Sequence, residues 1–198
     1  MSQAPELFVS TDIEADGPCP GPHSMLSVAS AVFTREGQVL DTFSVNLETL
    51  PGASPHPVTE RWWESQPQAW AACRRDLVPP QSALPRYRDW LRGLPGRPVF
   101  VGYPASFDFL FVGWYLMAFT GDNPFGFAAL DIKTYAMALF RTDFHATVRR
   151  RFAPGWFDDR PHTHVALDDA LEQGALLCNL FRYRDALDLP EGFPESSP

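Results

Sequence analysis

The sequence contains no hydrophobic run long enough to cross a membrane. Its longest apolar stretch, residues 107–119, includes an aspartate, whereas a membrane-spanning helix needs about 20 predominantly apolar residues. The N-terminus also lacks the basic segment and following apolar segment that are typical of a signal peptide. These absences predict a protein that has no membrane association and stays in the cytoplasm.

Cysteine is scarce as well. The three cysteines, Cys19, Cys73 and Cys178, are odd in number and have no spacing typical of metal ligands. This pattern argues against a disulfide framework and against a cysteine-bound zinc site. We expect three free thiols in a reducing compartment.

Hydrophobic residues make up 45% of the 198 residues, which is enough for one α/β domain with a substantial core. We expect this domain to span residues 1–190, followed by a flexible tail at residues 191–198. The 20 prolines gather in clusters that we expect to separate helices and strands. These clusters cover residues 18–22, 51–57, 79–85, 95–98 and 190–198.

Two carboxylates alternate at the end of the first apolar segment. Residues 7–14 are predicted to form a strand, which places Asp12 and Glu14 on the same face. Like charges at this spacing repel unless a cation lies between them. By itself, such a pair is more often a solvated strand end, but here it follows a predicted buried strand and precedes a turn. Two further strands are predicted at residues 25–33 and 39–47, joined by a hairpin turn.

A third carboxylate follows a later strand. Residues 98–103 are predicted to form this strand, and residues 107–117 a helix of almost unbroken apolarity that contains Asp108. A buried aspartate needs a partner. Asp108 is either stabilised by the dipole of the helix N-terminus or part of a ligand site at the carboxyl edge of the sheet.

The last informative segment is a polar stretch that leads into a helix. Apolar residues recur with helical spacing after residue 166, so Asp169 is predicted to project from the first turns of this helix. His164 then lies in the preceding loop or at the helix cap. A histidine in such a place is by itself most often a surface or capping residue.

These motifs together resemble those of a known family. The order of Asp-x-Glu at residues 12–14, Phe-Asp-Phe around Asp108, and a histidine five residues before Asp169-Ala170 is similar to the three motifs of the DEDD 3′-to-5′ exonucleases. The histidine assigns the resemblance to the DEDDh branch, which includes proofreading subunits of DNA polymerases, RNase T and oligoribonuclease. The resemblance implies an α/β, RNase H-like fold with a mixed central β-sheet flanked by helices.

The resemblance also implies a function and its residues. Two divalent cations, Mg²⁺ or Mn²⁺, would be held by Asp12, Glu14, Asp108 and Asp169, and His164 would act as general base. The expected partner is a nucleic acid with a free 3′ end. The expected reaction hydrolyses the terminal phosphodiester of single-stranded DNA or RNA and releases nucleoside 5′-monophosphates.

Two further segments resemble family members. Residues 59–70, which contain Trp62, Trp63 and Trp70, are similar to a Trp-Trp-x-x-Gln segment of phage and bacterial exonucleases, and we expect a helix that packs into the core. The same tryptophans are a candidate homodimer interface. Residues 131–134 resemble the strand that follows the second motif.

Some alternatives remain open. His162 and Asp168 lie beside the expected site residues, although the family spacing favours His164 with Asp169. A non-catalytic nucleic-acid or protein interaction module with the same fold is a second hypothesis. Such a module is expected to have lost a metal carboxylate, and none is missing, which favours the enzyme.

The net charge of −8 argues at first against a nucleic-acid partner. Bound divalent cations would weaken this objection, because they neutralise site carboxylates. Local basic character is provided by Arg149, Arg150 and Arg151, which are interleaved with aromatic residues. We predict that these arginines contact substrate phosphates, and a solvated surface is the alternative.

Overall fold

A five-stranded mixed β-sheet forms the centre of the computed structural model, which describes residues 4–160 and 163–187. The strand order is β3-β2-β1-β4-β5, with β1, β2 and β3 antiparallel and β4 and β5 parallel to β1. The strands are β1 (Glu6–Ala15), β2 (Met25–Phe33), β3 (Val39–Asn46), β4 (Arg97–Gly102) and β5 (Ala129–Asp131). The predicted mixed sheet is therefore confirmed, while the tail expected at 191–198 lies outside the described residues.

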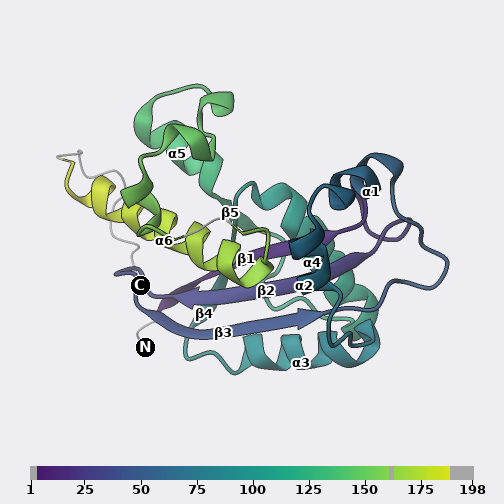
Figure 1. Ribbon diagram of the computed structural model, residues 1–198. Coiled ribbons are helices and arrows are strands. Elements are labelled where there is room, and N and C mark those ends of the chain that lie inside the picture. The colour runs from purple at the N-terminus through teal and green to yellow at the C-terminus, as the bar shows by residue number, and fades with distance from the viewer. Residues whose placement is uncertain (1–3, 161–162, 188–198) are drawn as a thin grey trace.

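Helices cover both faces of this sheet. Figure 1 shows α6 across one face and α3 against the other. The helices are α1 (Pro57–Glu64), α2 (Pro67–Cys73), α3 (Pro80–Arg92), α4 (Ala105–Thr120), α5 (Ile132–Phe140) and α6 (Ala166–Asp185). Between α5 and α6 the chain forms three short 3₁₀ turns, η1 (Phe144–Ala146), η2 (Arg149–Arg151) and η3 (Pro154–Phe157).

Alternation along β1 divides the core into two layers. Leu7 and Val9 pack in the layer that contains buried residues of α3 and α4. Phe8 points to the opposite layer, which α6 supplies. Because side chains of a strand alternate between faces, the even-numbered residues of β1 lie on the α6 side. Asp12 and Glu14 are thereby directed toward α6.

We expected the proline cluster at residues 79–85 to separate helices and strands, and this is wrong because α3 begins within it. Pro80 occupies the first turn, where a missing N–H removes no helical bond. Pro85 lies inside the same helix, although proline there removes one main-chain hydrogen bond. Buried neighbours such as Leu84 and Tyr87 hold this helix against the sheet, so packing outweighs the local preference.

Two other segments also differ from expectation. Residues 59–70 form parts of two short helices, because Pro67 begins α2 after α1 has ended. Residues 131–134 are mostly helical. Asp131 ends β5 and caps α5, since its carboxylate accepts a hydrogen bond from the Thr134 N–H at 2.7 Å.

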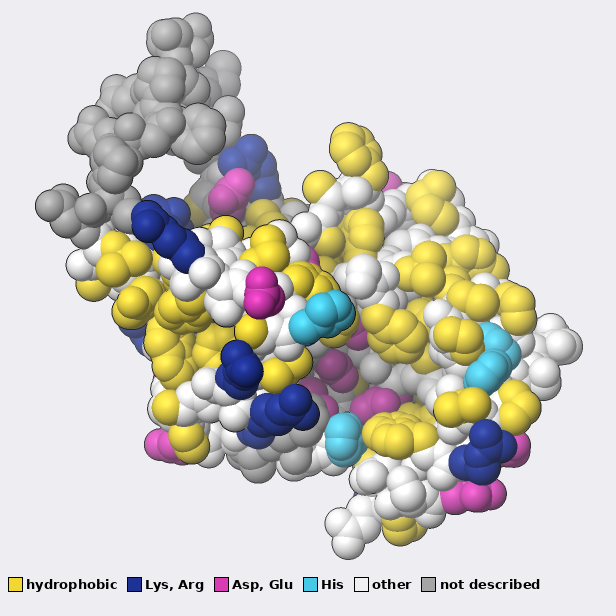
Figure 2. All heavy atoms as spheres, turned by 90° about the horizontal axis from the view of Figure 1, so that it is seen from above, with side chains coloured by type: hydrophobic (Ala, Val, Ile, Leu, Met, Phe, Trp, Pro, Cys, Tyr) yellow, Lys and Arg dark blue, Asp and Glu magenta, His cyan; other side chains and the backbone are white. Residues whose placement is uncertain are grey.

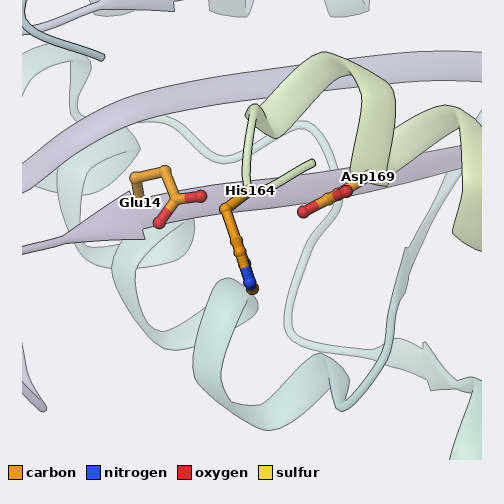
Figure 3. Close-up of side chains that lie close together, drawn as sticks. All are labelled: Glu14, His164 and Asp169. Atoms are coloured by element: carbon orange, nitrogen blue, oxygen red, sulfur yellow. The ribbon is translucent and has the colours of Figure 1, made fainter. Parts of the chain in front are cut away.

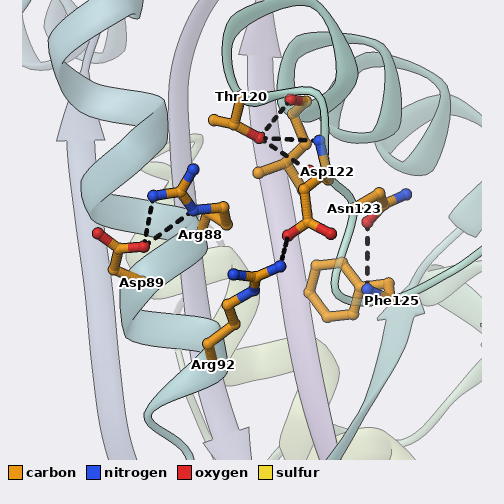
Figure 4. Close-up of polar contacts among 8 residues, drawn as sticks. Arg88, Asp89, Arg92, Thr120, Asp122, Asn123 and Phe125 are labelled. Carbon is orange, nitrogen blue, oxygen red and sulfur yellow. Dashed lines mark hydrogen bonds and ion pairs between the residues drawn. The ribbon is translucent and has the colours of Figure 1, made fainter.

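Polar contacts hold the end of α4 beside α3 (Figure 4). Arg92 of α3 forms an ion pair with Asp122 at 2.9 Å. The Thr120 hydroxyl donates to the Leu116 carbonyl at 2.6 Å and accepts from the Asp122 N–H at 3.2 Å. Gly121 then adopts a left-handed conformation with φ of 67°, which ends the helix.

Across residues 4–160 and 163–187, none of the helices has both the length and the apolarity that a membrane crossing requires.

Candidate active site

The first two carboxylates lie where β1 extends beyond β4. Pairing between β1 and β4 covers only Glu6 to Ser10 of β1, so this edge of the strand is open at Asp12 and Glu14. Glu14 is buried and Asp12 is half-buried. The end of β1 therefore presents two carboxylates on one face, as the sequence predicted, next to a main-chain edge that β4 does not occupy.

Asp108 fills part of that open edge. It lies in the first turn of α4 and accepts a hydrogen bond from the Ile13 N–H at 3.2 Å. Burial raises the pKa of Asp108 to about 8, although the Ile13 N–H partly offsets this rise. The start of α4 is held in turn by Asp131, whose carboxylate accepts from the Ala105 N–H at 2.8 Å.

Asp169 reaches the site from the first turn of α6. It is buried, and its Oδ1 accepts a hydrogen bond from the Thr163 N–H at 3.1 Å. Asp168 faces a different partner, the Thr163 hydroxyl, at 2.8 Å. His164, which directly follows Thr163, has a left-handed backbone with φ of 55°. A non-glycine residue is rarely held in this conformation.

Glu14, His164 and Asp169 converge on one point. Each offers a ligand atom, and these atoms all lie within 4.8 Å of one another. Figure 3 shows Glu14 coming from the end of β1, His164 from the loop before α6, and Asp169 from α6 itself. Two carboxylates and one imidazole at such separations form a suitable donor set for a divalent cation.

Asp12 connects this cluster to Asp108. Its pKa is raised well above the usual value, first by burial and then by the negative charges of Asp108, Glu14 and Asp169. Asp108 also bonds to the N–H of Ile13, the residue between Asp12 and Glu14, and Glu14 lies within 4.8 Å of Asp169 by their ligand atoms. The structure thus brings together all five residues that the sequence predicted, whereas His162 lies outside the described residues.

Two neighbours of the site were missed from the sequence. Gln173 donates its side-chain N–H to Asp12 at 2.8 Å. Its spacing of one helical turn from Asp169 is the signal that would have identified it. Trp62 lies with its ring 5.3 Å from that of His164 and perpendicular to it. The adjacent Trp63 donates its indole N–H to the Ala15 carbonyl at 3.0 Å, which fixes α1 beside β1.

The three predicted substrate arginines have different environments. Arg149 donates from Nε and Nη2 to the buried Glu172 of α6. With Arg150 it lines a hollow of about 400 Å³ that also includes Phe157. Arg151 lines a separate hollow. All three arginines are exposed, Arg149 with 43% of its side chain.

The space-filling view (Figure 2) shows how charged side chains are distributed on the face that carries the acidic site. In Figure 2, acidic side chains lie at the bottom of a depression, with basic side chains along one rim and hydrophobic side chains across from them. A polyanion that enters such a depression meets cationic groups before it reaches the carboxylates. The overall charge of −8 therefore understates the local basic character of this face.

Comparison with known proteins identifies clear relatives. No protein-family model matches the chain. The chain is 30% identical over 187 residues to a protein of Escherichia coli named 3′-5′ DNA exonuclease Cap18, covering 92% of this chain and 93% of that protein.

Solved structures share the fold at low identity. The nuclease domain of 3′hExo, described as a DEDDh family member bound to rAMP, has a TM-score of 0.66 and 12% identity over 93% of this chain and 94% of that chain. Escherichia coli Exonuclease I in complex with a dA16 oligonucleotide has a TM-score of 0.61 and 15% identity over 91% of this chain and 43% of that longer chain. The expected RNase H-like exonuclease fold is confirmed.

Proposed function

Because the chain belongs to the DEDDh family of 3′-to-5′ exonucleases, we propose that it removes nucleotides one at a time from the 3′ end of single-stranded DNA. DNA is preferred over RNA because the relative with 30% identity carries DNA exonuclease in its name. The observation that carries the proposal is the convergence of Glu14, His164 and Asp169 beside Asp12 and Asp108.

The donor set fits divalent cations. A cation placed between the four carboxylates would offset their mutual repulsion. Carboxylate oxygens are also the ligands that Mg²⁺ and Mn²⁺ prefer. We assign two such ions to Asp12, Glu14, Asp108 and Asp169. When bound, the ions would offset the negative charge that develops on the phosphodiester and on the leaving oxygen.

The protein side chains then have distinct tasks. His164 takes a proton from the water that attacks the terminal phosphorus, a role that suits an imidazole because its ordinary pKa is about 6.5. The bond between phosphorus and O3′ of the preceding nucleotide breaks. A nucleoside 5′-monophosphate leaves, and the shortened strand keeps a new 3′-hydroxyl after O3′ takes up a proton. The perpendicular Trp62 ring restrains the imidazole.

Substrate phosphates would contact the basic segment between α5 and α6. Arg150 and Arg151 are exposed and carry the positive charge that a phosphate needs. Arg149 is engaged by Glu172 and holds this segment on α6. We therefore assign phosphate contacts chiefly to Arg150 and Arg151, with Arg149 lining the same hollow as Arg150.

The reaction is tested by digestion of single-stranded DNA and RNA of the same sequence, labelled at either end. With Mg²⁺ or Mn²⁺, a 3′ label should leave at once as a mononucleotide, while a 5′-labelled strand shortens in single steps. EDTA should stop both, and Asp12→Ala protein is the control for contaminating nuclease. Early release of the 5′ label would contradict the polarity, and faster digestion of RNA would contradict the choice of sugar.

We also propose a homodimer and a cytoplasmic location. Trp63 is buried in its own chain, whereas Trp62 and Trp70 are partly exposed and remain a candidate homodimer interface, to be tested by analytical ultracentrifugation. Cys19, Cys73 and Cys178 are free thiols, which is consistent with the cytoplasm. Fractionation of cells that express the protein would test this location.

A further inference from the structure

Gln173 is a buried amide on α6 that reaches the end of β1. Its side chain is 5% exposed, and its Nε2 donates to Asp12 Oδ1 at 2.8 Å. The two residues are 161 positions apart in the chain, so this bond forms only when α6 is docked on the sheet. No other side-chain donor to Asp12 occurs among the described residues.

Packing alone does not account for an amide at this position. The other polar atom of the side chain, Oε1, is buried without a hydrogen-bond partner. A buried acceptor without a partner destabilises the folded protein. Methionine has a similar length and volume and would fill the space without that cost. The presence of glutamine at this position therefore points to the bond that its Nε2 makes.

That bond acts on a carboxylate with three acidic neighbours. Asp12 is affected by the negative charges of Asp108, Glu14 and Asp169. A neutral N–H donor favours the ionised carboxylate and fixes the plane of its two oxygens. It does so without adding a positive charge that would repel a cation. In metal sites, partners of this kind typically change metal affinity by about 10-fold to 100-fold.

We propose that Gln173 is a positioning residue that orients the Asp12 carboxylate for divalent cations, an inference that rests on the proposed metal-dependent function. The amide holds Oδ1 of Asp12 toward α6, so that the carboxylate has the required orientation before an ion arrives. Gln173 touches neither the substrate nor the reacting atoms. Its effect on the reaction passes through Asp12.

The test measures Mn²⁺ binding directly, by calorimetry or electron paramagnetic resonance, in the full-length protein without nucleic acid. Gln173→Met should raise the Kd for Mn²⁺ about 10-fold, while the Tm of the metal-free protein stays equal or rises, because the buried acceptor is removed. Gln173→Leu, which packs differently, should weaken Mn²⁺ binding to a similar extent. Saturating Mn²⁺ should restore most of the exonuclease rate of both variants.

Asn179 supplies a matched control on the same helix. Its side-chain amide donates to the Trp156 carbonyl and to the Asp158 carboxylate, each at 3.0 Å. Asn179 follows Asp169 by ten residues on α6, which places it away from the four carboxylates of the site. Asn179→Leu should lower the Tm and leave the Kd for Mn²⁺ unchanged. This is the opposite of the result expected for Gln173→Met, so the pair separates positioning from structural support.

The outcomes distinguish this inference from the proposed function. A wild-type Kd for Mn²⁺ in Gln173→Met, with or without a lower Tm, overturns the positioning role. The wild-type protein could bind Mn²⁺ and yet cleave no nucleic acid, which would contradict the proposed reaction. Weaker Mn²⁺ binding by Gln173→Met would still support the positioning role in that case. A wild-type protein that binds no Mn²⁺ overturns both.

Discussion

Helices α4 and α6 each bring an aspartate from their first turn to the end of β1, but they do so in different chemical settings. On α4, Asp108 is the only charged residue, and the outward face carries apolar side chains such as Leu110 and Met117, which are 48% and 55% exposed. On α6, the residues next to Asp169 add polar contacts. Gln173 bonds to Asp12, and Glu172 holds Arg149.

This difference shows which helix connects the parts of the site. α4 contributes one carboxylate and a large share of the hydrophobic core. α6 contributes a carboxylate, follows directly after His164, supports Asp12, and anchors the basic segment. Outside the carboxylates themselves, we therefore expect substitutions on or beside α6 to change the reaction more than substitutions on α4.

The largest expected effect is common to both helices. Asp108→Ala and Asp169→Ala should each lower kcat/KM about 10⁴-fold or more, and Asp12→Ala likewise, because each removes a carboxylate of the proposed metal site. Steady-state digestion of a 5′-labelled oligonucleotide measures this. Circular dichroism should show that all three variants remain folded. Full activity in Asp12→Ala would refute the metal assignment.

The next effect concerns the segment before α6. His164→Ala should lower kcat by about two to four orders of magnitude, the usual contribution of a general base, and reduce Mn²⁺ affinity much less. Single-turnover cleavage and Mn²⁺ titration measure the two quantities. His162→Ala is the control and should resemble wild type. A larger loss in the His162 variant would assign the general base to His162 instead.

The third effect is a pH dependence of the metal-free protein. Burial raises the pKa of Asp108 to about 8, so the folded state binds more protons than the unfolded state between about pH 4 and pH 8. Stability is therefore greatest at the acid end of this window and falls as pH rises through it.

Thermal unfolding in EDTA at a series of pH values measures this fall in Tm. Asp108→Asn should make the fall in Tm shallower, because it removes one carboxyl group with a raised pKa while Asp12, whose pKa is also raised, still titrates. Added Mg²⁺ should do the same in the wild-type protein, since a bound cation stabilises the ionised carboxylates. A Tm that rises from pH 5 to pH 8 without metal would contradict the electrostatic description of the site.

The smallest effects separate the arginines. Arg149→Ala should lower the free energy of unfolding by about 1 kcal/mol, because it removes an ion pair with the buried Glu172 that is screened on the Arg149 side, where the side chain is 43% exposed. Replacing Arg150 and Arg151 together by alanine should leave the Tm unchanged, raise KM and weaken its dependence on salt. Urea unfolding and KM at several salt concentrations measure these effects. An unchanged KM would leave Arg150 and Arg151 as solvated surface residues.

The sequence by itself determined four of the five strands, β1 to β4, and selected the proposed site residues, because both follow from local rules. The two-residue period of a strand placed Asp12 and Glu14 on one face. Helical periodicity placed Asp169 in the first turns of α6, and the expected boundaries of β2 agree with the structure. Since a motif is a set of local spacings, the family resemblance was also available from the sequence.

Only the tertiary structure decided which side chains meet across the fold. The bond between Gln173 and Asp12 and the pair of Arg149 with Glu172 depend on how α6 lies on the sheet, and no local spacing encodes that orientation. The same holds for Pro85, which is tolerated inside α3 because the buried face of that helix outweighs one lost hydrogen bond. Local patterns therefore selected the residues that we propose to react, and long-range packing selected the residues that contact and support them.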